Sequence, residues 1–474
     1  MQNYSLLTDL YQLTMAYGYW KSGLKDHEAV FHLFFRKNPF QGGYAIAAGL
    51  NAAIDLLNHF SIEKEDLTYL ASLKGNDGKP LFESDFLDYL EKLEMTCTVD
   101  AVPEGTPVFP HEPLLRIRGP IILGQILETP LLNMLNFQTL IATKASRICR
   151  AAKGEPVLEF GLRRAQGPDG GLSASRAAYI GGCAATSNVL AGKMYDIPVR
   201  GTHAHSWVMS FDSEEEAFTR YAEALPNNCV FLVDTYDTIE GVKKAIEVGK
   251  KLREKGSEMV GIRLDSGDLA ALSIEARKLF DEAGFPNASI VASNDLDEYM
   301  IEELKAKGAK INVWGVGTRL ATAYDQPALG GVYKLAAIRG PQEDWKFKIK
   351  LSEQLIKVSN PGILQVKRFV NGEKYVADVM VNEAGKQENI TSLKADKGNI
   401  SLEGLESKDL LVPVFDKGRL VYSQPDIHHI REFVQVELGK LPTEVLKNHD
   451  AEVYPVGLSD VLHKEKLAMI AELS

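Results

Sequence analysis

The middle of the chain alternates short apolar runs with helical patterns, and this alternation limits the possible folds more than any other feature. Runs of strand length lie at 157–160, 197–200, 230–233, 259–264, 289–292 and 311–316. Helical patterns at 239–255, 269–283 and 296–307 separate several of them, with Gly284 and Gly308 where helix C-caps are expected. Short, nearly all-apolar strands that alternate with helices predict parallel strands buried on both faces. At least six such strands within about 160 residues favour an irregular (β/α) barrel over an open sheet.

The flanking sequences predict a second, discontinuous domain. A helix-like stretch at 6–20 precedes an apolar strand at 30–35, and segments at 345–351, 364–370 and 375–381 alternate apolar and charged residues. Such alternation is typical of half-exposed antiparallel strands. We therefore predict an α/β fold with an α/β sandwich domain formed by residues 1–105 and 339–425, a (β/α) barrel catalytic domain at 106–338, and a helical C-terminal extension at 426–474.

Composition and charge exclude several classes of protein. The 474 residues are 45% hydrophobic and 25% charged, as in folded globular proteins, and the net charge of −11 argues against nucleic-acid or anionic-membrane partners. No apolar stretch approaches the about 18 residues of a membrane span, and no basic segment precedes an apolar core at the start of the chain. The four cysteines form no Cys-x-x-Cys pair, which is typical of reduced thiols. We expect a cytoplasmic protein.

Polar residues capable of chemistry follow each apolar run. They are Gly161 to Arg164, Gly201 to Trp207, Asp234, Asp265 to Asp268, Ser293 to Asp295, and Gly317 to Arg319. In α/β barrels the carboxyl ends of the strands face one side, and the loops that follow them carry the active site. Six such groups in register predict one functional site.

Two of these loops suit a phosphate group. Gly-Val-Gly-Thr at 315–318 offers backbone N–H groups where a loop meets a helix, and Ser293 and Asn294 supply short donors on the neighbouring strand. Adjacent loops late in a barrel are the usual place for a barrel phosphate site.

The Arg-Leu-Asp-Ser-Gly-Asp segment at 263–268 leaves two interpretations open. Asp265 and Asp268 either cap the helix that follows or bind ribose hydroxyls or a hydrated Mg²⁺. Arg263 points to the same side of its strand as Asp265. It either pairs with Asp265 or Asp234 or binds a substrate carboxylate or phosphate.

His203 and His205 form a His-x-His pair at a strand end. A metal-dependent hydrolase would need further histidines from later strands, but the next ones, His428 and His429, lie in the tail. Either histidine could be structural. The functional interpretation is that His205 acts as an acid, base or nucleophile, with Asp234 as a plausible partner for its other ring nitrogen.

Taken in order, five motifs resemble those of the nicotinate phosphoribosyltransferase family. They are Leu-Thr-Asp-Leu-Tyr-Gln at 7–12, Glu-Phe-Gly-Leu-Arg-Arg at 159–164, Gly-Thr-His-Ala-His-Ser-Trp at 201–207, Arg-Leu-Asp-Ser-Gly-Asp at 263–268 and Gly-Val-Gly-Thr at 315–318, and Leu-Gly-Gly-Val-Tyr-Lys-Leu at 329–335 adds to them. The resemblance runs nearly end to end. It implies an irregular barrel of the type II phosphoribosyltransferase kind beside an α/β sandwich, and a homodimer with active sites at the interface.

The same resemblance implies a reaction. Nicotinate and 5-phosphoribosyl 1-diphosphate would give nicotinate mononucleotide and diphosphate, the first step of NAD salvage from nicotinate. ATP hydrolysis would be coupled through a phosphohistidine, and Mg²⁺ would be required.

The resemblance also assigns roles to single residues. His205 would be the phosphorylated histidine, and Asp265 would face the ribose and bind Mg²⁺ through water. Phe160 would stack on the pyridine, and Tyr11 of the partner subunit would cover its other face. The remaining substrate-binding positions are Arg163, Thr202 and Arg263, for nicotinate and the phosphoribosyl diphosphate, and Ser293, Gly317 and Thr318, for the 5-phosphate.

Three alternatives remain open. The same chemistry could act on nicotinamide or quinolinate. Nicotinamide-using relatives, however, carry an aspartate where Ser187 stands here, and quinolinate-using relatives lack the Gly-Thr-x-Ala-His motif. A phosphosugar aldolase or isomerase would need a lysine or paired glutamates at a strand end, and no lysine stands there. A catalytically silent, ligand-sensing protein would not need His205, Arg263 and Asp265.

Overall fold

The computed structural model describes residues 4–386, 388–395 and 398–473. The chain divides into two compact units: Met1–Leu140 with Ala328–Ser474, and Ile141–Pro327. The sequence predicts the corresponding boundaries at 105 and 338. Both boundaries differ because strands β5 (Leu115–Pro120) and β12 (Val332–Arg339), which the prediction places in the barrel, belong to the first unit.

A seven-stranded sheet with the order β13-β12-β1-β5-β3-β19-β20 lies in the first unit, and its recorded pairings are antiparallel. Both β5 and β12 pair with β1 (Glu28–Phe34). Charged residues within these strands, such as Arg116 and Lys334, explain why they lie in this sheet, since a parallel strand covered on both faces is nearly all apolar. The other strands are β3 (Thr98–Ala101), β13 (Lys346–Phe347), β19 (Val412–Asp416) and β20 (Arg419–Leu420).

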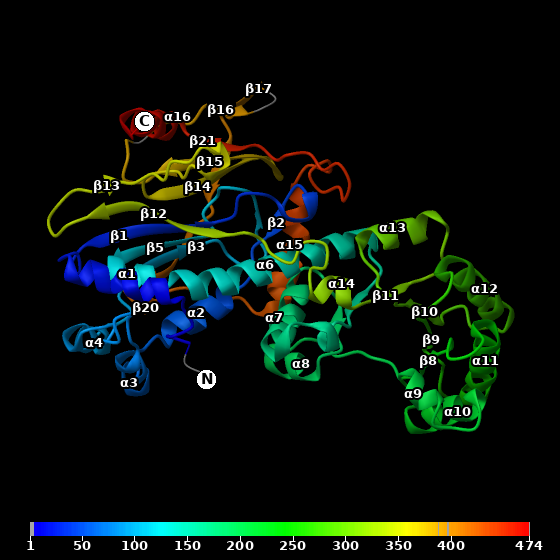
Figure 1. The fold of residues 1–474 in the computed structure, drawn as a ribbon. Helices are drawn as coiled ribbons and strands as arrows, with labels where there is room; N and C mark the ends of the chain where they lie inside the picture. Colours follow the sequence, from blue (N-terminus) through cyan, green and yellow to red (C-terminus); the bar gives the residue numbers. More distant parts are fainter. Residues whose placement is uncertain (1–3, 387, 396–397, 474) are drawn as a thin grey trace. The chain divides into compact units, whose positions relative to one another are not determined.

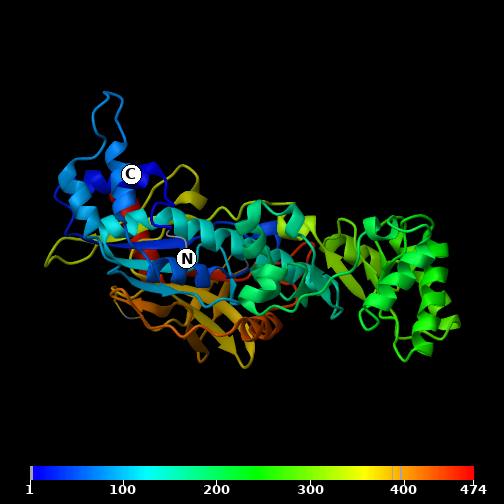
Figure 2. The ribbon, with the colours of Figure 1, turned by 90° about the horizontal axis from the view of Figure 1, so that it is seen from below.

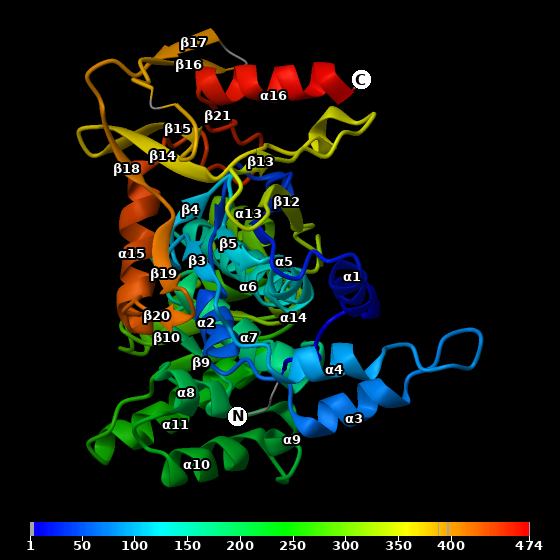
Figure 3. The same ribbon diagram turned by 90° about the vertical axis from the view of Figure 1, so that its left-hand side faces the viewer.

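A second, four-stranded sheet, β18-β14-β15-β21, is stacked on the first one (Figures 1 and 3). Its strands are β14 (Leu364–Asn371), β15 (Lys374–Asn382), β18 (Glu406–Asp409) and β21 (Val456–Leu458). The backbone of Leu364 ties the two sheets together, because its carbonyl accepts from Arg116 on β5 at 2.9 Å. Two short antiparallel pairs complete the unit's strands: β2 (Ala45–Ile46) with β4 (Pro107–Val108), and β16 (Ser392–Ala395) with β17 (Gly398–Ser401).

Helices flank these sheets. In the first unit they are α1 (Leu10–Lys21), α2 (Leu50–Asn58), α3 (Lys64–Ser72), α4 (Ser84–Glu91), α5 (Ile121–Ile126), α15 (Ile427–Lys440) and α16 (Asp460–Leu473), with 3-10 turns η1 (Pro39–Gln41) and η3 (Leu355–Lys357). Helix α5 packs on β1 and β5 and carries α1 on its other side. In the segment after residue 426, β21 lies between two helices and pairs in parallel with β15.

The second unit is built on a six-stranded parallel sheet with the order β7-β6-β11-β10-β9-β8. Its strands are β6 (Val157–Glu159), β7 (Ala185–Thr186), β8 (Val230–Leu232), β9 (Gly261–Leu264), β10 (Ser289–Ala292) and β11 (Val313–Val316). The last strand, β11, lies beside the first, β6, which is the strand order of a (β/α) barrel. Within residues 141–327 no ladder is assigned between the two edge strands, β7 and β8.

A helix follows each strand of the second unit in the chain. The unit's helices are α7 (Gly167–Ile180), α8 (Val189–Tyr195), α9 (His205–Val208), α10 (Glu214–Ala224), α11 (Thr238–Glu254), α12 (Leu269–Glu282), α13 (Glu298–Ala306) and α14 (Thr318–Ala321), with η2 (Leu162–Arg164) and the end of α6 (Glu128–Ala151). Helices α11 and α12 cover the outer side of the strands (Figures 1 and 2). Among the described helices, none has both the length and the hydropathy that crossing a membrane requires.

One predicted strand of the second unit is reduced to a single bridge. The sequence predicts a strand at 197–200, but only Val199 bridges, in parallel, to Thr186 of β7. Pro198 has no N–H to donate to a ladder, which limits pairing on this segment. The other five predicted strands correspond to β6, β8, β9, β10 and β11.

A buried ion pair stabilises the first unit. Arg368 of β14 faces Asp378 of β15, both side chains are fully buried, and Arg368 Nε lies 2.9 Å from Asp378 Oδ1. Arg368 also donates to the carbonyl of Pro107 at 2.9 Å. Burial and the charge of Asp378 raise the pKa of the neighbouring Glu112 well above its usual value. Arg368 is therefore the cation that compensates this buried acidic cluster.

We expect Arg368→Met to lower the free energy of unfolding of the first unit by about 3–5 kcal/mol, because Asp378 would remain buried without its cation. Urea unfolding measures this change. Lys367→Met is the matched control, since Lys367 lies next on the same strand but forms a half-exposed pair with Asp409. Its loss should cost less than about 1 kcal/mol. Equal losses in the two variants would contradict the role of burial.

Candidate functional site

Arg263 joins three loops at the carboxyl edge of the parallel sheet. It lies on β9, and its guanidinium donates to Ser293 Oγ after β10 at 2.8 Å, to Thr202 Oγ1 at 3.0 Å and to Asp265 Oδ1 at 2.9 Å. Of the two pairings that the sequence leaves open, the structure has the one with Asp265. The planar fork of arginine donors fixes the relative positions of these three side chains.

Asp265 is held as a carboxylate. Its burial opposes ionisation, but the hydrogen bonds from Ser293 and Arg263 and the charge of Arg263 outweigh it and lower the pKa of Asp265. Ser293 itself is 5% exposed and bonds to both Arg263 and Asp265. The site therefore presents a fixed negative charge next to a fixed positive one.

His205 faces this pair. It is the first residue of α9, its side chain is 42% exposed, and its Nε2 lies 3.9 Å from Asp265 Oδ2. Its Nδ1 lies 3.1 Å from Thr235 Oγ1. The sequence suggests Asp234 as the partner of this ring; that suggestion is wrong, because Asp234 turns to a neighbouring loop and the next residue, Thr235, takes its place.

Asp234 supports the loop that carries Asp265. Its Oδ2 accepts from the backbone N–H of Asp265 at 2.8 Å and from Ser266 Oγ at 2.7 Å. Its buried Oδ1 has no hydrogen-bond partner among the described residues. Asp268, by contrast, caps α12 by accepting from the N–H groups of Ala270 and Ala271, so the capping interpretation applies to Asp268.

His203 is buried and contacts other groups than His205 does. It is 8% exposed, and its Nε2 accepts from the backbone N–H of Leu232 on β8 at 3.2 Å. Its ring packs against Tyr221, with centroids 4.8 Å apart. Burial lowers the pKa of His203 to about 4, so the ring is neutral at physiological pH.

Phe160 lies across a glycine on the adjacent strand. A Cβ atom on Gly315 would come within 2.8 Å of the Phe160 ring, so only glycine at 315 leaves room for the ring in this position. The Phe160 N–H donates to the carbonyl of Val316 at 2.8 Å. The ring is half-buried and lies at the carboxyl edge of the sheet, where a flat apolar group could stack on it.

Glu159, directly before Phe160, holds the loop after β6 in place through its buried carboxylate. It is 1% exposed, and its carboxylate accepts from the N–H of Gly161, from Ser175 Oγ at 2.9 Å and from Thr186 Oγ1 at 2.6 Å. The buried carboxylate therefore holds the loop after β6 against α7 and the end of β7.

The two predicted phosphate loops follow adjacent strands. Ser293 follows β10, and Gly317 caps α14, whose first residue is Thr318. Asn294 and Asp295 adopt positive φ angles of 97° and 49°, and asparagine and aspartate are among the side-chain-bearing residues that do so most readily.

An ion pair joins these two loops. Arg319 Nη1 lies 2.8 Å from Asp297 Oδ2, and Asp297 also caps α13. The loops after β10 and β11 are thus fixed to one another.

Two further predicted residues, Arg163 and Tyr11, lie on helical elements. Arg163 is exposed on η2, beyond Phe160. Tyr11 belongs to the first unit, where it is 49% exposed on α1 and its hydroxyl lies 3.5 Å from Glu128 Oε1. The other predicted residues, His205, Asp265, Phe160, Thr202, Arg263, Ser293, Gly317 and Thr318, all lie at the carboxyl edge of the second unit's sheet or in the loops that follow it.

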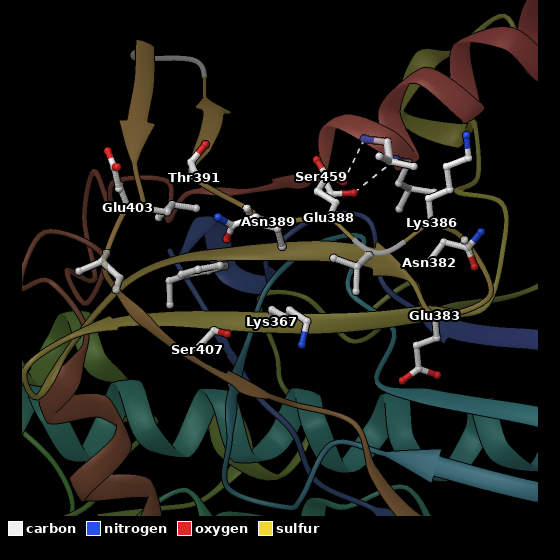
Figure 4. A pocket seen from close by; sticks show the side chains of 18 of the residues that line it. Lys367, Asn382, Glu383, Lys386, Glu388, Asn389, Thr391, Glu403, Ser407 and Ser459 are labelled. Carbon is white, nitrogen blue, oxygen red and sulfur yellow. Dashed lines mark hydrogen bonds between the residues drawn. The ribbon is translucent and has the colours of Figure 1, made fainter.

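A wide cleft of about 640 Å³ lies elsewhere, in the first unit (Figure 4). It is lined by residues of β14, β15 and β18 and by the loop that contains Glu388, which accepts from the N–H groups of Asp460 and Val461 at the start of α16. None of the predicted site residues lines it. Within the described residues, no group of three or more histidine, cysteine or acidic side chains could hold a metal ion by itself.

The sequence analysis gives no supporting role to Glu159, which lies within an apolar run, or to Thr235, an ordinary residue after a strand. It leaves a structural role open for His203, and the buried ring has that role. The available signal is for Glu159 alone, since a carboxylate in a buried strand needs hydrogen-bond donors. The partners of Thr235 and His203 come from distant segments, which no local pattern reveals.

Comparison with known protein families finds three matching segments. Residues 6–136 match the family model described as the nicotinate phosphoribosyltransferase N-terminal domain, residues 157–343 match the nicotinate phosphoribosyltransferase family, and residues 364–466 match the corresponding C-terminal domain.

Individual relatives are similar over nearly their whole length. The chain is 46% identical to the nicotinate phosphoribosyltransferase of Bacillus subtilis, over 99% of this chain and 96% of that protein. It is 35% identical to the human nicotinate phosphoribosyltransferase, over 96% and 95%. The crystal structure of human nicotinic acid phosphoribosyltransferase superposes with a TM-score of 0.85 at 32% identity, covering 98% of this chain and 99% of that one. A nicotinate-nucleotide pyrophosphorylase from Pyrococcus furiosus shares the fold, with a TM-score of 0.71 at 24% identity over 92% and 96%.

The buried His203 predicts a pH dependence. Its pKa is about 4 in the folded protein and about 6.5 in an unfolded chain, so the unfolded state binds more protons between these values. We expect this group to make the free energy of unfolding rise with pH from about 4 to 6.5, by at most about 3 kcal/mol, and to contribute no slope above that window. Unfolding measured against pH for the parent and for His203→Gln tests this, and identical slopes would contradict it.

Proposed function

The chain belongs to the nicotinate phosphoribosyltransferase family, and we propose that it joins nicotinate to the phosphoribosyl group of 5-phosphoribosyl 1-diphosphate. The products are nicotinate mononucleotide and diphosphate. The observation that carries the proposal is the cluster of Arg263, Asp265 and Ser293 beside His205, on neighbouring strand ends of one parallel sheet.

The bond-forming step needs little covalent work from the protein. The pyridine nitrogen donates its lone pair to C1 of the ribose as the bond from C1 to the diphosphate oxygen breaks, and the electrons of that bond leave with the diphosphate. Positive charge develops on C1 between these events. Catalysis is then mainly positioning and charge stabilisation, and the fixed carboxylate of Asp265 is suited to the developing positive charge.

The anionic parts of the substrates require donors. Ser293, Gly317 and Thr318 are proposed to bind the 5-phosphate, because they offer hydroxyl and backbone N–H groups on adjacent loops. Thr202, Arg263 and the exposed Arg163 are proposed to bind the diphosphate and the nicotinate carboxylate. Arginine suits both groups, since its fork matches their paired oxygens.

The pyridine ring requires a flat apolar slot. Phe160 supplies one face of it, and we propose that Tyr11 of a second copy of this chain supplies the other. The second copy is also supported by exposed apolar side chains on α1, such as Leu10 and Met15, and on α8, such as Val189 and Met194. A homodimer with shared active sites would cover them.

His205 is proposed to couple ATP hydrolysis to the reaction. A ring nitrogen of His205 would attack the γ-phosphorus of ATP, forming an N–P bond while the P–O bond to ADP breaks, and water would later hydrolyse the phosphohistidine. The exposed ring next to Thr235 and Asp265 supports this role, because the ring must accept a phosphoryl group and be held in one orientation.

Mg²⁺ is the expected metal. It is commonly held by one or two carboxylates together with water and substrate phosphates, so a site without three protein ligands fits it. Asp265 would bind it through water, and the buried Oδ1 of Asp234, which has no hydrogen-bond partner among the described residues, is a further acceptor on the neighbouring loop. The ion would neutralise charge on the leaving diphosphate.

Two broader features belong to the same proposal. The strand order supports an irregular barrel closed between β6 and β11, of the type II phosphoribosyltransferase kind. A cytoplasmic location is supported by the four cysteines, Cys97, Cys149, Cys183 and Cys229, which are free thiols.

We expect the protein to form nicotinate mononucleotide from nicotinate, phosphoribosyl diphosphate and Mg²⁺, at a rate that ATP raises by about tenfold or more. Mass spectrometry after exposure to ATP should show one phosphoryl group on His205, and His205→Asn should lose both the phosphoryl group and the acceleration. Turnover of nicotinamide but not nicotinate would overturn the proposed substrate.

Ser187 is proposed to favour nicotinate over nicotinamide. It follows β7, and its N–H donates to the carbonyl of Glu159 at 2.9 Å, next to Phe160. A hydroxyl at this position does not repel the nicotinate carboxylate, whereas an aspartate would.

We expect Ser187→Asp to raise the KM for nicotinate by about tenfold or more, through repulsion between two carboxylates. Ser187→Asn introduces a side chain of the same size as aspartate but without its charge, and its KM for nicotinate should stay within about threefold of that of the parent protein. Steady-state kinetics with both pyridines measures the change. If Ser187→Asp leaves nicotinate turnover unaltered, Ser187 does not select the substrate.

A further inference from the structure

Within residues 141–327, the two edge strands of the parallel sheet, β7 and β8, do not pair with each other. We call the gap between these two edges the seam, and the side chain of His203 bridges it. Strands β7 and β8 are the two edges of the sheet, and the segment at 198–200 extends the β7 edge through the Val199 bridge. Leu232 on β8 pairs with Arg263 on β9 on its other side. Its N–H points across the seam and donates to His203 Nε2 at 3.2 Å.

This contact replaces a backbone acceptor with an imidazole nitrogen. Nε2 can accept only when it carries no proton, so the ring proton must be on Nδ1, which lies 3.4 Å from the carbonyl of Ala204. Burial against Tyr221 and Phe218 keeps the ring neutral. The ring therefore has one tautomer and a fixed direction.

The two segments joined at this point meet again at His205. Thr235 comes three residues after Leu232, and His205 comes two residues after His203. Nδ1 of His205 lies 3.1 Å from Oγ1 of Thr235. A second tie on the same loop is Thr202, which accepts from Arg263 at 3.0 Å. Trp207, just beyond, donates to the carbonyl of Ala217 at 3.0 Å.

We propose that His203 is a positioning residue that closes the seam and thereby sets the place of His205 relative to Thr235 and Asp265. The proposal rests on the proposed function, in which His205 accepts a phosphoryl group. Without the acceptor at 203, the Leu232 N–H would be buried and unpaired, and the loop at 201–205 would be free to move away from β8.

Two variants separate the acceptor from the ring. His203→Phe retains an aromatic ring against Tyr221 but has no acceptor. His203→Gln places an amide oxygen where Nε2 lies and can accept from Leu232. Thermal unfolding of both shows whether the second unit remains folded.

The readout is the rate at which phosphohistidine forms at saturating ATP, in the absence of the other substrates. We expect His203→Phe to lower this rate by about tenfold or more without changing the ATP concentration for half-maximal rate, and His203→Gln to stay within about threefold of the parent protein. A rate in His203→Phe equal to that of the parent, or an equal loss in both variants, would overturn the positioning role.

A nitrogen-15 spectrum of the histidine side chains distinguishes failure of this inference from failure of the proposed function. Absence of phosphohistidine in the parent protein would contradict the proposed ATP coupling. The spectrum would still support the positioning role if His203 carries its proton on Nδ1 and the His205 signals move in His203→Phe but not in His203→Gln. The spectrum would overturn that role if the His205 signals in His203→Phe are the same as those in His203→Gln.

Discussion

The guanidinium of Arg263 is the contact on which the candidate site depends. Its donors reach Thr202, Ser293 and Asp265, which belong to three different loops, and those loops carry His205, the phosphate donors and the fixed carboxylate. An arginine on a buried strand is costly unless its donors are satisfied. Here the same hydrogen bonds that compensate for burial also determine the relative positions of the reacting groups.

Sequence pattern predicted β6, β8, β9, β10 and β11 of the second unit because they are short and apolar, whereas the two-residue strand β7 was not predicted. It assigned β5 and β12 to the barrel although Arg116 and Lys334 interrupt their apolar character. Pairing partners such as β1 and β12 are some 300 residues apart in the chain, and local periodicity carries no information on such distances. The segment at 197–200 is apolar enough for a strand, but its proline limits the pairing.

The types of residue in the candidate site were readable from sequence, whereas their contacts were not. Position after a strand was enough to bring His205, Asp265 and Ser293 to one edge, since parallel strands end on the same side. Which neighbour each contacts depends on loop conformation: Thr235, not Asp234, meets His205, and Asp268 turns to its helix. Glu159 and His203 are buried next to the site and hold its loops in place through hydrogen bonds to other segments.

The division of the chain has a consequence for its synthesis. The second unit is one continuous stretch of the chain between two segments of the first unit, whose strands β1 and β3 pair with β12 and β19 from the far side of that stretch. Domains made on the ribosome usually fold in order from the N-terminus. In this chain the inner unit has all its strands once residue 327 has emerged, whereas β1 and β3 gain their partners β12 and β19 only from the last third of the protein. Until then the edges of β1 and β3 that later pair with β12 and β19 lack these partners.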